Sequence, residues 1–126
     1  MSYEANKEKA RVGILALSEA FPEIFNRNRP KPLALGIAQQ LAQARRSGAL
    51  NISVLVQRAA MNAWVNSIPY HRSMALTPCR YNLDGSSFGL ISDDHRQRSI
   101  DKIKAYKKIK AARRQANKNQ KFKVAA

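Results

Sequence analysis

The stretch "YHRSMALTPCRYNLDG", residues 70–85, gathers side chains that could do chemistry. It contains a histidine, the only cysteine of the chain, two arginines, two tyrosines and an aspartate. Residues of these types can form a metal site or a nucleophile with its base, or they can form a polar surface that binds an anion. Their spacing has to distinguish these possibilities.

The metal and catalytic interpretations find little support in the spacing. His71, Cys79 and either Asp84 or His95 do not form a CxxC, HxxxH or HExxH pattern. Cys79 follows a proline at the start of an expected strand, where a small buried residue is ordinary. We therefore expect no metal, no cofactor, no small-molecule substrate and no enzymatic activity. A nuclease built on His71 and Arg80 is the enzymatic alternative.

The charge balance points to an anionic partner. The chain has 23 lysines and arginines against 8 acidic residues, a net charge of +15. Residues 101–126 carry ten of the bases and one acid, and no lysine lies between Lys31 and Lys102, where arginine recurs. Arginine can hold a phosphate bidentately and stack on a base, whereas lysine is a mobile point charge. We infer an arginine-bearing fold with a lysine-rich arm that attracts the partner.

Length and cysteine content favour one small cytoplasmic domain. A chain of 126 residues holds a single domain with a modest core. One cysteine cannot form an internal disulfide, and no signal sequence is recognisable, so a reducing cytoplasm is expected. The longest apolar runs, "GILAL" and "ALGIA", are far shorter than the roughly 20 residues that span a bilayer. We expect a cytoplasmic monomer that does not bind membranes.

The pattern predicts a mainly helical fold with a small β-hairpin, an α+β arrangement. Apolar residues four, three and four positions apart predict a helix from the N-terminus to Phe21. Prolines and asparagines predict a loop at residues 26–32. A second helix is expected from about Leu33 to Arg46, closed by Gly48 and closely packed at Gly36.

Two further helices are marked by their caps. Asn51 or Ser53 should cap a third helix that continues to about Val65, and Ser67 should cap a short fourth helix with a proline in its first turn. Trp64, near the end of the third helix, is expected in the core.

The last third of the chain predicts a hairpin and a basic helix. Asp84-Gly85 suits a tight turn between "CRYNL" and "SSFGLI", and Ser92 followed by two aspartates suits a helix start. The expected organisation is an N-terminal arm at 1–7, a domain at 8–112 that includes the basic helix from about residue 93, and a basic tail at 113–126. That tail has too few apolar residues to fold unaided, so we expect it to be disordered.

The residue types at positions 70–81 are best suited to binding single-stranded RNA. Tyr70, Arg72, Arg80 and Tyr81 place two aromatic rings and two guanidinium groups on a short helix and the strand after it. Arg58 should be exposed on the third helix, opposite its apolar stripe. Either tyrosine could instead belong to the core with its hydroxyl at the rim.

Several linked motifs resemble one family. "FPEIF" at 21, "KPLALGI" at 31, "LVQRAAMNAWVNSIPYHRSMA" at 55 and "CRYNLDG" at 79 are similar, in order and spacing, to the ProQ/FinO family of bacterial RNA-binding proteins, over about residues 8–112. "DDHRQRSIDKIKAYKKIKAAR" is similar to the basic helix of plasmid-encoded members. The resemblance implies a compact FinO-like domain and an RNA chaperone. Its ligand would be a hairpin with a single-stranded 3′ tail, and it would act on small or antisense RNAs and mRNAs in post-transcriptional regulation.

The resemblance also implies site residues. Tyr70 and Arg80 would hold the RNA 3′ end, with Lys31 and Arg58 on the same face, and the helix start near Ser53 would offer N–H groups to stem phosphates. The complete set of expected RNA-binding residues is Tyr70, Arg80, Arg58, Lys31, Arg72, Ser53, Tyr81, Arg45, Arg46, Lys102, Lys107 and Lys108.

This chain departs from the family at four positions where members often carry a base, namely Ala34, Val54, Asn62 and Ala75. Affinity is therefore expected to depend more on Arg45, Arg46, Arg72 and the tail. A small basic ribosome-associated protein is the alternative binding function, while a DNA-binding protein would need a recognition helix that is not evident.

Overall fold

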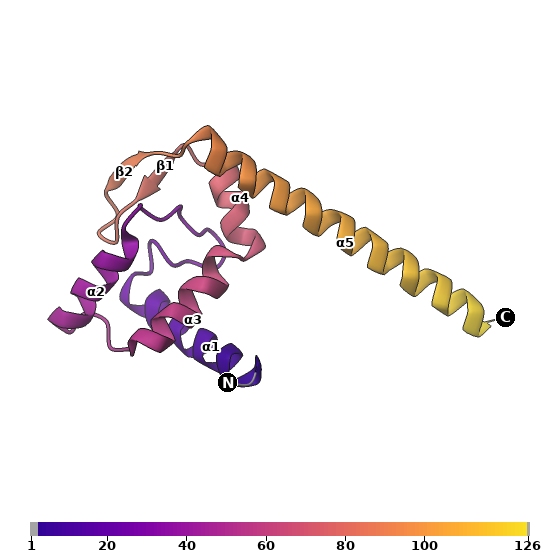
Figure 1. The fold of residues 1–126 in the computed structure, drawn as a ribbon, viewed down its shortest axis with the longest axis horizontal. Helices are drawn as coiled ribbons and strands as arrows, with labels where there is room; N and C mark the ends of the chain where they lie inside the picture. The colour runs from indigo at the N-terminus through magenta and orange to yellow at the C-terminus, as the bar shows by residue number, and fades with distance from the viewer. Residues whose placement is uncertain (1–2, 126) are drawn as a thin grey trace.

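The computed structural model describes residues 3–125, with side chains described for residues 4–120. A helical body carries one long projecting helix (Figure 1). The elements are α1 (Tyr3–Ala20), α2 (Ile37–Ser47), α3 (Val54–Val65), α4 (Ile68–Leu76), β1 (Cys79–Tyr81), β2 (Ser87–Leu90) and α5 (Asp93–Ala125). The predicted fold class, mainly helical with one small hairpin, is confirmed.

Helices α1 and α3 pack closely because α1 carries a glycine at their contact. A Cβ atom added to Gly13 would lie 2.6 Å from the Cβ atom of Ala60 and 2.9 Å from the carbonyl oxygen of Val56. Both distances are too short for a real side chain. Glycine thus lets the two backbones approach, and Leu17 is fully buried in the core one turn further along α1.

The core lies between α1, the loop that follows it, and helices α2 to α4. Phe25, Ile24 and Leu41 are fully buried, and Trp64 is 5% exposed. The Phe25 and Trp64 rings pack with centroids 5.3 Å apart in a tilted arrangement. The prediction that Trp64 belongs to the core is confirmed.

The start of α2 differs from the prediction. The helix begins at Ile37 instead of Leu33, and Leu33 forms a parallel β-bridge with Tyr81. Gly36 is the residue before the helix, with a φ of 80°, and a Cβ atom added to it would meet no other atom within 4 Å. The glycine therefore serves the backbone turn, and the expected close packing at this position was wrong. Gly48 closes the helix, as predicted.

The predicted caps of the next two helices are confirmed. The Ser53 side chain accepts a hydrogen bond from the Val56 N–H at the start of α3. Ser67 does the same for the Tyr70 N–H at the start of α4, where Pro69 occupies the first turn. Each serine satisfies an N–H group that has no partner within the helix.

The hairpin joins the body through its first strand. Strands β1 and β2 pair antiparallel, with Cys79 opposite Leu90 and a register shift between Arg80 and Tyr81. On its other side β1 meets the loop before α2, where the Tyr81 N–H donates to Pro32 O (2.8 Å). The Leu33 N–H of the same loop donates to the Tyr70 hydroxyl of α4, so the loop, the strand and α4 come together at one place.

Two side chains fasten α5 to α4. The guanidinium Nη1 of Arg96 donates to the carbonyl oxygens of Met74, Ala75 and Thr77 at the end of α4 (3.0–3.3 Å). These oxygens have no partner within their helix, so the arginine acts as a cap supplied by another element. The Nδ1 atom of His71 lies 3.1 Å from the hydroxyl of Ser99. The start of α5 at Asp93 is as predicted.

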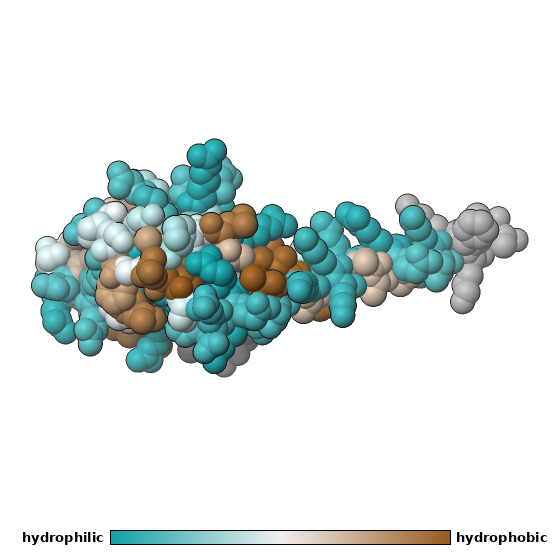
Figure 2. Space-filling model, turned by 90° about the horizontal axis from the view of Figure 1, so that it is seen from above, coloured by the Kyte–Doolittle hydropathy of each residue, from teal (hydrophilic) through white to brown (hydrophobic). Residues whose placement is uncertain are grey.

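Beyond this junction α5 leaves the body (Figure 1). All side chains from residue 104 to 120 are exposed. The sequence predicts a disordered tail from residue 113, but the helix continues through Ala125. No glycine or proline interrupts this segment, and its alanine, lysine, arginine and glutamine residues have high intrinsic helix propensity. Figure 2 shows a mostly hydrophilic surface along the projecting helix. Among the described residues, none of the helices has the length and apolar character needed to cross a membrane.

Candidate functional site

The backbone of Leu33 is held by two of the expected site residues. The Tyr70 hydroxyl oxygen accepts a hydrogen bond from the Leu33 N–H (3.1 Å), and Arg80 Nη1 donates to the Leu33 carbonyl oxygen (2.8 Å). Tyr70 comes from α4 and Arg80 from β1, so the site depends on the meeting of these elements with the loop before α2. The structure thus brings the two residues together, as expected.

Arg80 is a buried cation. Its residue is 8% exposed. A second guanidinium nitrogen, Nη2, lies 2.8 Å from Nδ1 of His95 on α5. Because arginine stays protonated and donates, His95 Nδ1 must accept and the ring proton lies on Nε2. No carboxylate pairs with Arg80 among residues 4–120. Burial of an uncompensated charge is costly, and an approaching anion would supply the missing counter-charge.

Tyr70 keeps its proton. Burial raises the pKa of its phenol, while the Leu33 N–H and the nearby Arg80 charge oppose this effect. The hydroxyl oxygen already accepts from Leu33, so its proton remains to be donated. Tyr70 and Arg80 together therefore present donors and positive charge, which is the chemistry that a phosphate or ribose oxygen requires.

Two further expected site residues adjoin this contact in the chain: Tyr81 follows Arg80, and Lys31 lies two residues before Leu33. Lys31 Nζ stands over the Tyr81 ring at 4.9 Å from its centroid, and both residues are half-buried. This cation–π contact fixes the ammonium group beside the hairpin and covers one ring face. Tyr81 also packs against the hydrophobic core.

The N-terminus of α3 is open to an anion. The Ser53 cap satisfies the Val56 N–H, and the first two residues of the helix, Val54 and Leu55, are 41% and 53% exposed. The N–H groups of the first turn have no acceptor within the helix. Together with the positive end of the helix dipole they can receive a phosphate oxygen.

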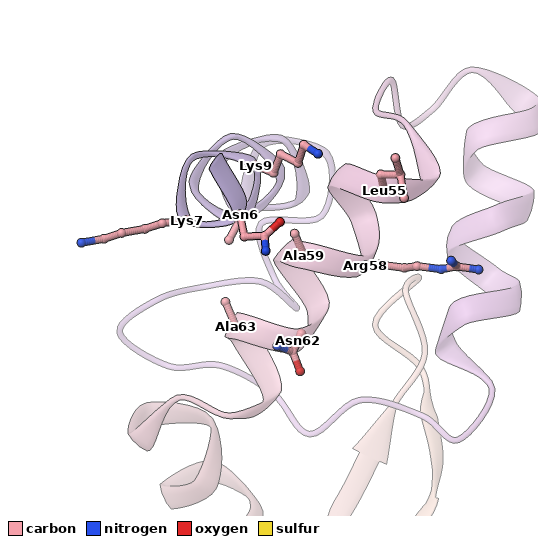
Figure 3. Close-up of a pocket in the computed structure, with 9 residues that line it drawn as sticks. Asn6, Lys7, Lys9, Leu55, Arg58, Ala59, Asn62 and Ala63 are labelled. Carbon is pink, nitrogen blue, oxygen red and sulfur yellow. The ribbon is translucent and has the colours of Figure 1, made fainter. Parts of the chain in front are cut away.

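Three arginines lie on α2 and α3 near this helix start. Arg45 is half-buried and its Nε donates to Gln57 Oε1 (2.7 Å), which ties α2 to α3. Arg46 and Arg58 are exposed. In Figure 3 the Arg58 side chain extends away from α1 toward the side of α2, whereas Lys7 points away from α3. The exposed position predicted for Arg58 is confirmed. Of the three arginines, Arg45 is the one whose guanidinium group already has a hydrogen-bond partner, Gln57.

A groove of about 600 Å³ lies between α1 and α3. Figure 3 shows residues that line it, with Asn6 on α1 and Ala59 on α3. Lysines 7 and 9 stand at its α1 side. We assign this groove no ligand.

The α5 lysines do not share one face. With 3.6 residues per turn, Lys107 and Lys108 lie about 140° and 240° around the helix from Lys102. All three are exposed. A different set forms one stripe along the helix and lines a shallow surface groove there, namely Lys107, Lys110, Arg114 and Lys118. Sequence reasoning missed this stripe, although its spacing of three and four is visible in the letters.

Arg72 lies apart from the Tyr70 and Arg80 pair. It is exposed on α4, where it lines a groove with Arg27 and Arg29 from the loop after α1. Sequence reasoning named neither loop arginine as a site residue, although both stand in a proline- and asparagine-rich segment that predicts a fixed loop.

The histidine and the cysteine that first suggest chemistry have other positions. Burial first, and the Lys102 charge second, lower the pKa of His71, so the ring is held in its neutral form against Ser99. Cys79 is half-buried in β1. Within the described residues, no three His, Cys, Asp or Glu side chains are grouped as a metal site would require.

These features define a small, mainly helical, strongly basic domain with a buried arginine at the meeting point of a loop, a helix and a hairpin. The family model described as ProQ/FINO family matches residues 7–116. The chain therefore belongs to the ProQ/FINO family.

Individual relatives agree with this assignment. The chain is 31% identical over 108 residues to the RNA chaperone ProQ of Idiomarina loihiensis, which covers 85% of this chain and 51% of that protein. It is 34% identical over 83 residues to the RNA chaperone ProQ of Vibrio vulnificus, covering 65% of this chain and 40% of that protein. The chain thus spans about half the length, or less, of these relatives.

A solved structure shares the fold. The crystal structure of a FinO-like RNA chaperone from Neisseria meningitidis superposes with a TM-score of 0.58 and 22% sequence identity. The match covers 74% of this chain and 92% of that one. The expected FinO-like fold is confirmed.

Proposed function

We propose that this domain binds RNA as an RNA chaperone, and that its ligand is a hairpin followed by a single-stranded 3′ tail. The observation that carries the proposal is Arg80, a buried guanidinium without a carboxylate partner in the described residues, beside the protonated hydroxyl of Tyr70. A 3′-terminal nucleotide offers the phosphate and ribose oxygens that both groups lack. The family of the chain and the names of its relatives support the same function.

The surrounding charged groups support separate contacts to the RNA stem and to its 3′ end. The N-terminus of α3 and the exposed Arg46 and Arg58 would contact stem phosphates, while Lys31 and Tyr81 would contact the 3′ nucleotides. The projecting α5 would raise the association rate and contact duplex without sequence preference. A cytoplasmic monomer acting on small or antisense RNAs and their mRNAs is the form that we propose, without enzymatic activity.

The test compares two RNAs. Arg80→Ala should weaken binding of a hairpin with a free 3′ tail at least ten-fold more than binding of a blunt duplex of the same stem, measured by gel mobility shift at fixed salt. Arg11→Ala is the matched control, because Arg11 is exposed on α1 and already paired with Glu8. An equal loss of affinity for both RNAs would refute the assignment of Tyr70 and Arg80 to a pocket for the RNA 3′ end.

A second experiment addresses the targets. Crosslinking in the native cell, followed by sequencing of the bound RNA, should give reads that end at terminator hairpins. Reads spread over ribosomal RNA would favour a ribosome-associated protein instead.

A further inference from the structure

Two adjoining hollows lie between the loop after α1 and the α3–α4 junction. One is an apolar slot of about 220 Å³, lined by Ile14, Ala63 and Trp64 among others. The other is a polar groove of about 470 Å³. Arg27, Pro30 and Pro69 line both, so the slot and the groove open into each other.

The groove is positively charged. Arg27 and Arg29 from the loop and Arg72 from α4 line it, and none of the described residues that line it is acidic. All three arginines are exposed, and the one ion pair among residues 4–120, Glu8 with Arg11, involves none of them. Because a guanidinium group can hold two oxygens of one phosphate, three of them around one groove make an oxyanion site.

The loop that carries two of these arginines is fixed before any ligand binds. The Asn26 side-chain oxygen accepts from the N–H groups of Asn28 (2.9 Å) and Arg29 (3.3 Å). The Ser73 hydroxyl of α4 donates to the Pro30 carbonyl oxygen, which fastens the loop to the opposite wall of the groove. A preorganised loop reduces the entropic cost of binding.

The only tryptophan of the chain lines the slot. Its indole Nε1–H is buried and has no hydrogen-bond partner among the described residues. The volume of the slot is below the roughly 300–1,000 Å³ of pockets that enclose whole drug-sized ligands, so it suits one flat ring. Proline side chains on two sides give that ring apolar walls.

We propose that the slot and groove bind one unpaired nucleotide, with its base in the slot and its phosphate on Arg27, Arg29 and Arg72. The Trp64 ring would pack beside the base. The site is separate from the Leu33 contact, since Arg72 lies about 200° around α4 from Tyr70. The proposal rests on the proposed function in one respect, that an RNA strand supplies the nucleotide. A free nucleotide carries the same chemistry.

The experiment uses the only tryptophan of the chain as a reporter. The full chain is titrated with tetrauridylate, with uridine 5′-monophosphate and with inorganic phosphate, and Trp64 fluorescence is followed. Uridine is the probe because pyrimidines are the smaller bases and the slot is small. We expect saturable quenching by tetrauridylate, and inorganic phosphate should compete without quenching. Saturation by the monophosphate at similar concentration would identify a free nucleotide as the ligand, whereas saturation by tetrauridylate alone would identify an RNA strand.

Matched variants make the test specific. Arg27→Ala with Arg72→Ala should raise the half-saturating concentration at least ten-fold, while the control Arg11→Ala should change it less than two-fold. All three arginines are exposed, so urea unfolding of the variants should match the wild type. Absence of quenching by either uridine ligand, or equal behaviour of the double variant and the control, overturns the proposal.

The same variants separate this proposal from the proposed function. If the wild-type protein binds the 3′-tailed hairpin but its Trp64 fluorescence is not quenched by the uridine ligands, the nucleotide site is refuted and the proposed RNA function still stands. Quenching that depends on Arg27 and Arg72, in a chain whose hairpin binding does not depend on Arg80, retains the nucleotide site and refutes the Tyr70 and Arg80 pocket.

Discussion

The hydroxyl of Tyr70 can be removed without changing the shape of the core. Its oxygen accepts the Leu33 N–H at 3.1 Å, and both residues are buried, Tyr70 at 6% and Leu33 at 2% exposure. Tyr70→Phe keeps the ring and deletes only this acceptor. The Leu33 N–H then has no partner in a place that solvent does not reach.

The expected cost follows from that geometry. A buried donor left without an acceptor costs about 1–3 kcal/mol, and because the ring still packs, no cavity cost is added beyond the volume of one oxygen. For a chain of this size, such a loss corresponds to a fall in Tm of roughly 3–10 °C. Arg80 should still hold the Leu33 carbonyl oxygen, so the fold should survive.

Urea unfolding followed by circular dichroism measures the change. The midpoint should fall while the m-value stays constant, since the surface exposed on unfolding is the same. Tyr106→Phe is the control, because Tyr106 is 41% exposed on α5, and its unfolding midpoint should not move. A Tyr70→Phe protein as stable as the wild type would refute the argument that Tyr70 anchors Leu33.

The remaining predictions address packing, pH and salt. Gly13→Ala should destabilise the fold by about 1–3 kcal/mol in urea unfolding, because the new Cβ atom would lie 2.6 Å from the Cβ atom of Ala60. As the control, Ala5→Gly on the exposed start of α1 should cost no more than about 1 kcal/mol. Folding lowers the pKa of His71, so between about pH 6.5 and the lowered pKa the unfolded chain binds more protons than the folded one. The free energy of unfolding should therefore fall as the pH drops through this range. His71→Gln should lack this pH dependence when unfolding is measured from pH 8 to 5. Replacing the stripe Lys107, Lys110, Arg114 and Lys118 by glutamine should flatten the salt dependence of RNA binding by up to about 0.7–0.9 in slope per charge, and an unchanged slope would show that the stripe makes no phosphate contact.

Features set by nearby residues were predictable from the sequence. The serine caps at Ser53, Ser67 and Ser92 each accept from an N–H group three residues along, and the Asp84-Gly85 turn closes within the hairpin itself. These hydrogen bonds need only the local chain. Their residue types therefore predict the structure without knowledge of the rest of the fold.

The misplaced start of α2 shows the limit of local pattern. Apolar spacing from Leu33 fits a helix, but the Tyr81 N–H and carbonyl oxygen pair instead with Pro32 and Ala34, and this pairing holds the segment extended. A partner so distant in the chain leaves no mark in the spacing of residues 33–36. The glycine at 36 was the available signal, since its positive φ of 80° ends the extended segment and begins the helix.

The position of Arg80 depends on the same distant contacts and explains why the candidate site was only partly predictable. Residue types place an arginine on a short strand, and the family resemblance adds Tyr70 beside it. Neither indicates that the guanidinium is buried, that it donates to Leu33 O, or that His95 supplies a second acceptor. These two acceptors are neutral, so they orient the group without cancelling its charge, whereas a carboxylate in either place would have done both. An arginine fixed in this way retains its full charge, which an approaching anion can neutralise.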